Sequence, residues 1–549
     1  MSAEDRDRLL ERALTRRALL RYGAGAVGGA TLAGILAACG GEGGEAAPAP
    51  EPAPAPPPAE TGETAPATTE EAAPTSGGTL KFALGDGQSS DSLDPALQFT
   101  GVGITTGGMV YDNLLHTDND WNLTPALAED WDVSPDATRY TFKLRQGVEF
   151  HSGKTLDAND VAEQFLRVLD EKTGSGGLSL LGAVLDPSGV KVGDPSTITF
   201  ELKAPDAFFG IKAAHYYTRI PQAGTTDWLA GSPGTGPFKS VSFRPAEGNE
   251  LVRNENYWQE GLPYLDEINI VVIPEQATKT QAVLTGDVDL SDPPPLAALD
   301  QFEASDVAAL IAVSNSPYTY DIDSSIKPYS DPRVSQAMKM LIDREKALQI
   351  IVRGRGVVSA DSLIHPSDPF YPADLEPYPY DPEQAKALLA EAGYPDGFKE
   401  DIWTTTAYPY LDEGAAVAKE AWAAGGIDAT IQSVSNDRYL KAFLNEPIVM
   451  DYYLRQHPVL TFELYYASGV QNTTRLNDQQ IDGWVAELKK ELDLTRQKEI
   501  AGDIIRRYNE IAAEIVPFHF DDLWAHKTRV TNLVLSPMAK FEFAQIQLA

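Results

Sequence analysis

Residues 124–170 contain the pattern of a short hairpin followed by an amphipathic helix. Residues 139–145 alternate strictly between apolar and polar side chains, as in a half-buried antiparallel strand. The Ser-Pro-Asp string at 134–136 precedes them as a turn, because proline fixes φ and short polar side chains hydrogen-bond the nearby backbone. Asp157 is placed to cap a helix, with Asp160 three residues further on as its capping-box partner. The stretch therefore predicts a small unit of strands and one helix, a pattern common to many folds.

The particular amino acids of this stretch are more specific than its secondary structure. Four short strings follow one another in order: Pro-Ala-Leu-Ala-Glu (125–129), Tyr-Thr-Phe-Lys-Leu-Arg-Gln-Gly-Val (140–148), Phe-His-Ser-Gly (150–153) and Ala-Asn-Asp-Val (158–161). Their succession closely resembles the signature of the extracytoplasmic solute-binding proteins of family 5, which serve dipeptide, oligopeptide and nickel ABC importers. Further strings at 234–239, 253–258, 331–337 and 380–394 also resemble the family. The resemblance therefore covers residues 78–549.

The resemblance implies an α/β, two-lobed periplasmic-binding-protein-like fold of the large type II class, with an extra small domain inserted in the first lobe. Periodicity alone predicts only a mixed α/β chain with several domains, because 549 residues exceed one compact core. From the resemblance we expect two lobes that close on a ligand by hinge motion. The expected boundaries are 79–118, 223–313 and 528–549 for lobe I, 119–222 for the small domain and 314–527 for lobe II.

Glycine-rich segments give two more local expectations. Residues 100–108 are small and rich in glycine, so we expect a loop that either presents backbone amides to a ligand or simply connects two elements. Residues 110–115 are expected to form a helix that runs into the next strand. Gly234 and Gly236, on either side of a threonine and followed by proline, predict a tight crossing between the lobes.

Residues 1–39 are predicted to be an export signal of a lipoprotein and not part of the fold. Arg16 and Arg17 lie in a string that resembles a twin-arginine motif, and an uncharged Gly- and Ala-rich run follows. Residues 36–39 resemble a lipobox, in which Cys39 becomes the diacylated first residue of the mature protein. A transmembrane helix is the alternative for this run, but glycine and alanine make it a weak span. Cys39 is the only cysteine, so the folded part has no thiol for a disulfide or a reactive site.

Composition limits the location and the partners. Residues 40–78 are rich in Pro, Ala and Glu and lack core residues, so we expect a disordered linker that holds the folded body away from the bilayer. The net charge of −36 argues against nucleic acid as a partner, because phosphates require a basic surface. We expect an extracytoplasmic monomer, lipid-anchored on the periplasmic side or outer face of the cytoplasmic membrane. The resemblance implies a small solute and an ABC permease with its ATPase subunits as partners; use of the Tat or the Sec route stays open.

Residues 450–458 correspond to the ligand motif of the family's peptide binders, a Gly-Trp stretch followed by an Asp that pairs with the peptide α-amine. Here Arg455 or Gln456 falls near the acidic position. A guanidinium at that position disfavours a free ammonium and favours a carboxylate or phosphate. We therefore expect an acidic or N-blocked peptide, or an oligosaccharide on the aromatic residues nearby. In the alternative, Arg455 pairs with a protein carboxylate and Tyr453 belongs to the core. The candidate ligand-binding residues are Trp403, Tyr452, Tyr453, Arg455, Gln456 and His457.

The sequence carries no pattern that indicates catalysis. Its seven histidines show neither His-x-His nor HExxH spacing for a metal, and there is no G-x-S-x-G elbow. Acid pairs abound in so acidic a chain, so they do not indicate glycoside hydrolysis. We expect a protein that is not an enzyme, with no cofactor and no metal. A surface-anchored hydrolase and an adhesive lipoprotein are the alternatives from other classes, and free-amine peptides and metal chelates stay open as ligands.

Overall fold

The computed structural model describes residues 76–549 except 230, 232, 406–408, 444, 470–471 and 536–540. The predicted export signal, with Arg16, Arg17 and Cys39, lies outside the described residues, as does most of the predicted linker. Within the part that the structure describes, no helix has the length and apolarity that a membrane span requires.

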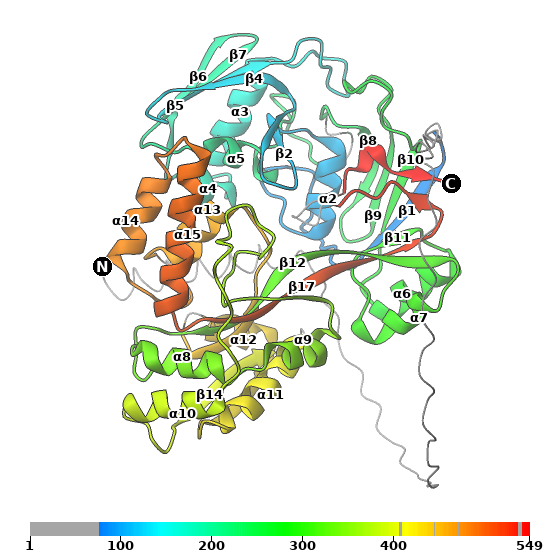
Figure 1. Cartoon of the computed structure of the whole chain (residues 1–549). Coiled ribbons are helices and arrows are strands. Elements are labelled where there is room, and N and C mark those ends of the chain that lie inside the picture. Colours follow the sequence, from blue (N-terminus) through cyan, green and yellow to red (C-terminus); the bar gives the residue numbers. More distant parts are fainter. Residues whose placement is uncertain are drawn as a thin grey trace, which may run out of the picture. The chain divides into compact units, whose positions relative to one another are not determined.

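An eleven-stranded mixed sheet runs through the folded body (Figure 1). Its order is β15-β14-β16-β12-β17-β11-β1-β10-β9-β8, and β13 pairs with β17 off this path. The strands are β1 (Thr79–Leu84), β8 (Phe238–Arg244), β9 (Gly248–Arg253), β10 (Glu267–Val272), β11 (Leu290–Ser291), β12 (Ala308–Ile322), β13 (Gly356–Val358), β14 (Lys399–Thr405), β15 (Asp428–Val434), β16 (Ile448–Tyr452) and β17 (Ile515–Lys527). The long strands β12 and β17 pair antiparallel and join the two halves of the sheet. On its other side, β17 pairs with β11 of one half, and β12 pairs with β16 of the other half.

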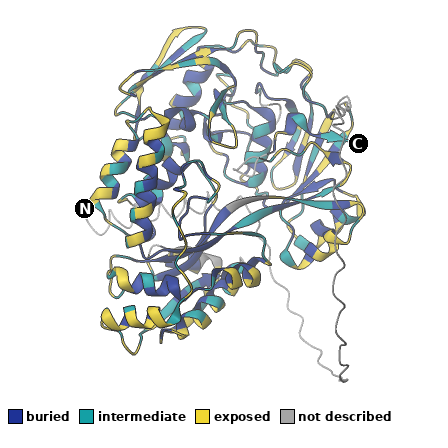
Figure 2. Ribbon diagram, viewed as in Figure 1, coloured by how far each residue is buried: buried dark blue, intermediate teal, exposed yellow. Residues whose placement is uncertain are grey.

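Each half of the sheet has its own hydrophobic core. On the β14–β16 side, Tyr318, Tyr320 and Trp422 are fully buried in a large cluster. The helices of this side are α8 (Pro332–Met340), α9 (Arg344–Val352), α10 (Pro382–Glu391), α11 (Pro409–Ala423) and α12 (Asn436–Ala442). On the other side, Phe82 and Trp524 belong to a separate cluster. Its helices and short elements are α2 (Gly101–Val110), α6 (Gln276–Thr285), η2 (Leu296–Ala298), α7 (Leu299–Glu303), β18 (Val530–Thr531), η4 (Phe543–Gln545) and β19 (Gln547–Leu548). Helices α8 to α11 turn a buried face inward and an exposed face to solvent (Figure 2).

A smaller antiparallel sheet of four strands, in the order β4-β5-β7-β6, lies apart from the large one. The predicted strand at 139–145 is confirmed as β5, whose alternate side chains Tyr140, Phe142 and Leu144 are buried. The sequence 148–150 also has the residues of a short second strand, but in the structure this segment forms only an isolated bridge between Glu149 and Thr155. The elements are β2 (Leu115–Thr117), β3 (Leu123–Pro125), β4 (Ala128–Val133), β5 (Arg139–Leu144), α3 (Ala158–Leu169), α4 (Gly177–Leu181), β6 (Leu185–Asp194), β7 (Thr197–Leu202), α5 (Phe209–Ala213) and η1 (Tyr216–Thr218).

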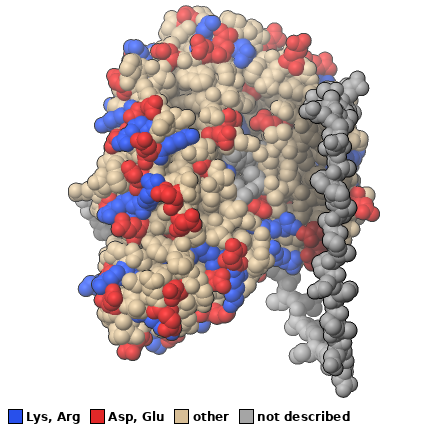
Figure 3. All heavy atoms as spheres, viewed as in Figure 1, with Lys and Arg blue, Asp and Glu red and all other residues tan. Residues whose placement is uncertain are grey.

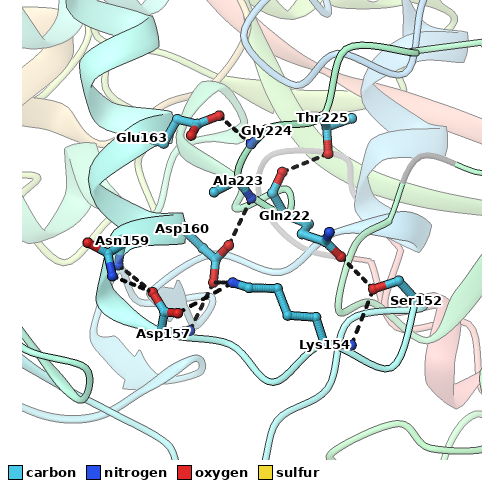
Figure 4. Close-up of polar contacts among 10 residues, drawn as sticks. All are labelled: Ser152, Lys154, Asp157, Asn159, Asp160, Glu163, Gln222, Ala223, Gly224 and Thr225. Carbon is cyan, nitrogen blue, oxygen red and sulfur yellow. Dashed lines mark hydrogen bonds and ion pairs between the residues drawn. The ribbon is translucent and has the colours of Figure 1, made fainter.

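The predicted capping box at the start of α3 is confirmed, and it also fixes a distant loop (Figure 4). The fully buried Asp160 carboxylate accepts hydrogen bonds from Asp157 N at 2.9 Å and from Ala223 N at 2.8 Å, and it pairs with Lys154 Nζ at 2.5 Å. We call this group the Asp160 clasp; its outer members are Ser152, Asn159, Glu163, Gln222, Gly224 and Thr225. It ties the family-like Phe-His-Ser-Gly turn and α3 to residues 222–225, which follow η1.

The last helices pack against residues of the small-sheet region. They are α13 (Pro458–Thr461), the π-helix η3 (Phe462–Tyr466), α14 (Gln479–Leu488) and α15 (Leu494–Ile511). Phe208 and Ile211 share one core cluster with Tyr466, Ile504 and Tyr508 of these elements. The small-sheet region and the carboxyl-terminal helices therefore form a common apolar interface.

The expectation of a loop at 100–108 is wrong, because this segment forms helix α2. Side chains accept hydrogen bonds from the free N–H groups of the first turn. Thr100 Oγ1 accepts from Gly103 N, and the Asp86 carboxylate accepts from the N–H groups of Gly101 and Val102. These caps satisfy N–H groups that every helix start leaves free, and they offset the low helix propensity of glycine. The expected helix at 110–115 is also wrong, since α2 ends at Val110 and β2 begins at Leu115.

Gly234 and Gly236 lie against the carboxyl-terminal end of α2. A Cβ at Gly234 would collide with the carbonyl oxygen of Val110, and one at Gly236 would lie 2.6 Å from the carbonyl oxygen of Met109. Glycine is needed here because the two backbones approach each other closely.

Candidate ligand-binding site

A cavity of about 280 Å³ lies beside α2. Its walls come from segments that are far apart in the sequence: the face of α2, residues 111–117, Arg219, the end of β17 and the carboxyl-terminal residues 541–545. Leu454 and Arg455, which follow β16 of the other half of the sheet, complete it. The cavity is thus built from both halves of the large sheet and from the small-sheet region, which makes it the candidate ligand site.

The buried acids of the cavity already have partners in the protein. Asp112 accepts hydrogen bonds from Thr235 Oγ1 at 2.8 Å, Trp258 Nε1 at 3.0 Å and Tyr257 OH at 3.3 Å. Asp292 contacts Lys279 Nζ and accepts from a backbone N–H at 2.7 Å. These carboxylates therefore hold the walls of the cavity together.

Asp86 is the third buried acid of the cavity. Burial raises the pKa of Asp86 to about 7, although the hydrogen bonds from Gly101 and Val102 at the start of α2 lower it. Asp86 therefore combines a raised pKa with two hydrogen bonds that cap the start of α2.

Arg219 is the basic wall of the cavity next to α2. Its side chain is only 5% exposed, and its Nη1 donates to the carbonyl oxygen of Ile104 at 2.7 Å and to Gln98 Oε1 at 3.2 Å. Burial lowers the pKa of Arg219 to about 10, so the guanidinium is protonated at neutral pH.

Arg455 also lines the cavity, but its charge is paired. Its Nη2 lies 3.4 Å from Asp368 Oδ2, and its guanidinium carbon lies 5.8 Å from the centre of the Trp121 ring. Trp121 Nε1 donates to the same oxygen of Asp368 at 2.7 Å. This is the geometry of the alternative in which Arg455 pairs with a protein carboxylate, and it joins the segment after β16 to the small-sheet region.

Tyr452 and Tyr453 are packed side chains in this structure. The Tyr452 ring lies between those of Tyr410, at 5.6 Å, and Phe520, at 5.9 Å. Tyr453 OH donates to Asp321 Oδ2 at 2.6 Å, and Tyr453 is part of a hydrophobic cluster.

The remaining predicted residues are distributed around the segment after β16. His457 caps α13, since its Nδ1 accepts from Val459 N at 3.1 Å, and burial lowers its pKa to about 3. Gln456 lines a second cavity, next to α4 and α14. Trp403 lies on β14 beneath the guanidinium of Arg438 at 4.7 Å, and its partner on β16 is Val449, three residues before Tyr452. Of the six predicted residues, the cavity beside α2 includes Arg455 in its wall.

Sequence reasoning missed Arg219, Asp86 and Asp112. Each is a single charged residue without motif spacing. Asp86 and Arg219 contact α2, which was expected to be a loop, and Asp112 follows the end of that helix. In the described part of the chain, no group of three or more His, Cys, Asp or Glu side chains is arranged to hold a metal ion. On the face drawn in Figure 3, basic side chains are interspersed with acidic ones and do not gather into a single basic patch.

Comparisons with a family model and with individual proteins point to the same family. The model of bacterial extracellular solute-binding proteins, family 5 Middle, matches residues 122–468. Heme-binding protein A of Haemophilus influenzae is 32% identical over 338 residues, which are 57% of this chain and 61% of that protein. Glutathione-binding protein GsiB of Pectobacterium atrosepticum is 29% identical over 325 residues, 58% of this chain and 62% of that protein. The matched region therefore spans less than two thirds of the length of these relatives.

Among solved structures, the periplasmic binding protein DppA from Helicobacter pylori in complex with the peptide STSA aligns with a TM-score of 0.72. The alignment has 25% sequence identity and covers 86% of this chain and 98% of that one. It confirms the expected two-lobed α/β fold. The family and both relatives are described as binding proteins and not as enzymes, in agreement with the sequence. The chain belongs to the bacterial extracellular solute-binding proteins of family 5.

Proposed function

We propose that this protein is the solute-binding lipoprotein of an ABC importer. It captures a peptide-like or related solute in the cleft between its two lobes and delivers it to a membrane permease, whose ATPase subunits hydrolyse the ATP. The observation that carries the proposal is the cavity of about 280 Å³, whose wall combines α2 with Arg455 from the other half of the sheet. The relatives that bind glutathione and heme, and the neighbour that holds a peptide, support a small organic solute.

The lobe boundaries proposed from the sequence place the hinge on the long strands β12 and β17. Lobe I would comprise 79–118, 223–313 and 528–549, the small domain 119–222 and lobe II 314–527. The pairing of β12 with β17 shifts register between Ser314 and Ser316 and again between Tyr318 and Tyr320, close to the proposed crossing. Irregularities of this kind disrupt the ladder locally and bend the strand, which supports a hinge there.

The proposed ligand class is an acidic or N-blocked peptide. Its support is that two arginines, Arg219 and Arg455, line the cavity. The acids of the wall are Asp86, Asp112, Asp292, Asp522 and Glu542, and the three buried ones among them have protein partners. An oligosaccharide on Trp403, Tyr452 and Tyr453 is the second candidate. It requires the two tyrosine rings to leave their present neighbours, so the peptide has the stronger support.

We further propose export through the twin-arginine string and a lipid anchor at Cys39. A diacylated cysteine would hold the protein on the membrane, with the solute site outside. Cys39→Ser should move the protein from the detergent phase to the aqueous phase in phase partition, and Arg16→Lys with Arg17→Lys should block export if the Tat route is used. Unchanged partition of Cys39→Ser would contradict the anchor.

The function is tested by thermal unfolding of the purified protein with separate pools of free-amine peptides, N-acetylated peptides, oligosaccharides and nickel chelates. A ligand at 100 times its dissociation constant adds about 2.7 kcal/mol to the free energy of unfolding. Stabilisation by acetylated or acidic peptides is the expected result. Stabilisation by free-amine peptides alone would contradict the ligand class, and no stabilisation by any pool would contradict solute capture.

A further inference from the structure

Arg219 differs from the other buried cations of the described structure. Five Lys or Arg side chains are buried: Lys212, Arg219, Lys279, Lys339 and Arg344. Three of them contact carboxylates, in the pairs Lys212–Asp206, Lys279–Asp292 and Arg344–Asp361. Lys339 Nζ donates to the carbonyl oxygens of Asn509 and Ala512 at the carboxyl-terminal end of α15, where the helix dipole favours a cation.

Arg219 has no carboxylate within ion-pair distance among the described residues. Its protein partners are two neutral oxygens, both on Nη1. The Asp112 carboxylate interacts electrostatically with Arg219, but its oxygens accept hydrogen bonds from Thr235, Tyr257 and Trp258. A buried charge without a counter-charge is costly, so a buried arginine of this kind at a cavity wall points to a ligand that supplies the missing partner.

The guanidinium is also held in place. A Cβ at Gly107 would lie 2.5 Å from Arg219 Nη1, and one at Gly108 would lie 3.1 Å from Nη2. The glycine face of α2 therefore makes room for the guanidinium. The hydrogen bond from Nη1 to Ile104 fixes its orientation, and among the described residues Nε and Nη2 have no hydrogen-bond acceptor. The side chain lines the cavity, so these donors are available to a solute.

We propose that Arg219 recognises a carboxylate of the solute. This inference rests on the proposed function and deepens it, because it assigns the anion subsite to a residue that the family-like ligand motif does not contain. Planar guanidinium and carboxylate groups pair through two parallel hydrogen bonds, which gives specificity as well as affinity. Arg455 faces the same cavity with its charge already paired to Asp368 and is the secondary basic group.

The test uses two matched pools of N-acetylated peptides, one with free carboxylates and one with all carboxylates converted to amides. Shifts of the thermal midpoint are measured for the parent protein, Arg219→Gln, Arg219→Lys and, as the matched control on the same cavity, Arg455→Gln. We expect free acids to stabilise the parent and amides not to do so. Arg219→Gln should lose about 10- to 100-fold in affinity for the acids, as for a hydrogen-bonded charge, and Arg455→Gln should lose less.

The empty protein provides a second readout. Arg344→Gln breaks a buried ion pair and should lower the stability of the ligand-free protein, whereas Arg219→Gln removes an uncompensated charge and should lower it less. A destabilisation by Arg219→Gln equal to that of Arg344→Gln, with unchanged affinity, would assign Arg219 a purely structural role and overturn the inference.

The comparison of acids with amides on the parent protein does not depend on any variant folding. Equal stabilisation by both pools would overturn the anion subsite while solute capture stands. No stabilisation by either pool, together with a response to oligosaccharides, would overturn the inference and the peptide class. If no pool shifts the thermal midpoint, the proposed function is overturned as well.

Discussion

Replacing Asp160 by alanine should open the Asp160 clasp and release residues 222–225. The Asp160 carboxylate holds three donors at once: Asp157 N, Ala223 N and Lys154 Nζ. Alanine keeps the helix propensity high, so the effect of the substitution comes from these contacts and not from the helix itself. Asp157→Ala is the matched control, because it makes the same substitution three residues earlier in the same capping box.

The magnitude follows from the contacts that are lost. Two backbone N–H groups lose their acceptor, and each such loss costs about 1–3 kcal/mol when water does not replace it. Lys154 is 37% exposed, so its ion pair adds less than about 1 kcal/mol. We expect Asp160→Ala to lower the free energy of opening this region by about 2–4 kcal/mol. Asp157→Ala removes one partly exposed helix cap and should cost about 1 kcal/mol.

Hydrogen exchange measures this locally, which matters because a chain with several cores does not unfold in two states. A loss of about 2.8 kcal/mol corresponds to about 100-fold faster exchange. In Asp160→Ala, exchange should become faster at the amides of Ala223 and Gly224 and in the first turn of α3. The exchange rates in α8 and α10 should not change. Equal exchange in Asp160→Ala and Asp157→Ala, or unchanged exchange at residues 222–225, would refute this account of the clasp.

Other substitutions test the packing of the cavity and of the interface around α13. Gly107→Ala should destabilise the protein despite the better helix propensity of alanine, because its Cβ would collide with two polar side chains. Gly103→Ala is the control, since the atom nearest to its Cβ would lie at 3.2 Å, and it should be close to neutral. Urea unfolding measures both. His457 has a pKa of about 3 when folded and about 6.5 when unfolded, so the unfolded chain binds the extra proton as pH falls below 6.5 and stability is lost. His457→Asn keeps a helix cap and should remove about 1.4 kcal/mol of that loss per pH unit between pH 6 and 4, measured by urea unfolding at each pH. Glu463→Gln weakens the pair with Lys212 and should speed proteolysis between the small-sheet region and α13; an unchanged cleavage rate would show that this ion pair does not hold the interface.

Local sequence patterns predicted those elements whose stability is local. The strand at 139–145 and the cap at Asp157 depend on neighbours within a few residues, and the structure confirms them. The predicted loop at 100–108 was wrong for the opposite reason, because helix α2 depends on distant residues. Its glycines disfavour a helix, and the groups that stabilise it include the Asp86 carboxylate, 15 residues before it, and Arg219, 115 residues after Ile104. Neither contact leaves a trace in the periodicity of the segment.

The difference between local and distant contacts also explains why the sequence predicted a basic residue at the ligand site but did not predict Arg219. A match to the family motif identifies Arg455 and suggests a reversed charge, but its partner Asp368 lies 87 residues away and takes up that charge. Trp121 donates to the same carboxylate, so this group links parts of the protein and adds little net charge to the cavity. Arg219 also lines the cavity, and its hydrogen-bond partners among the described residues are neutral oxygens, so its charge has no ion pair there. The two arginines therefore act differently: loss of Arg455 should weaken the link between these parts of the protein, and loss of Arg219 should reduce the discrimination between a carboxylate and its amide.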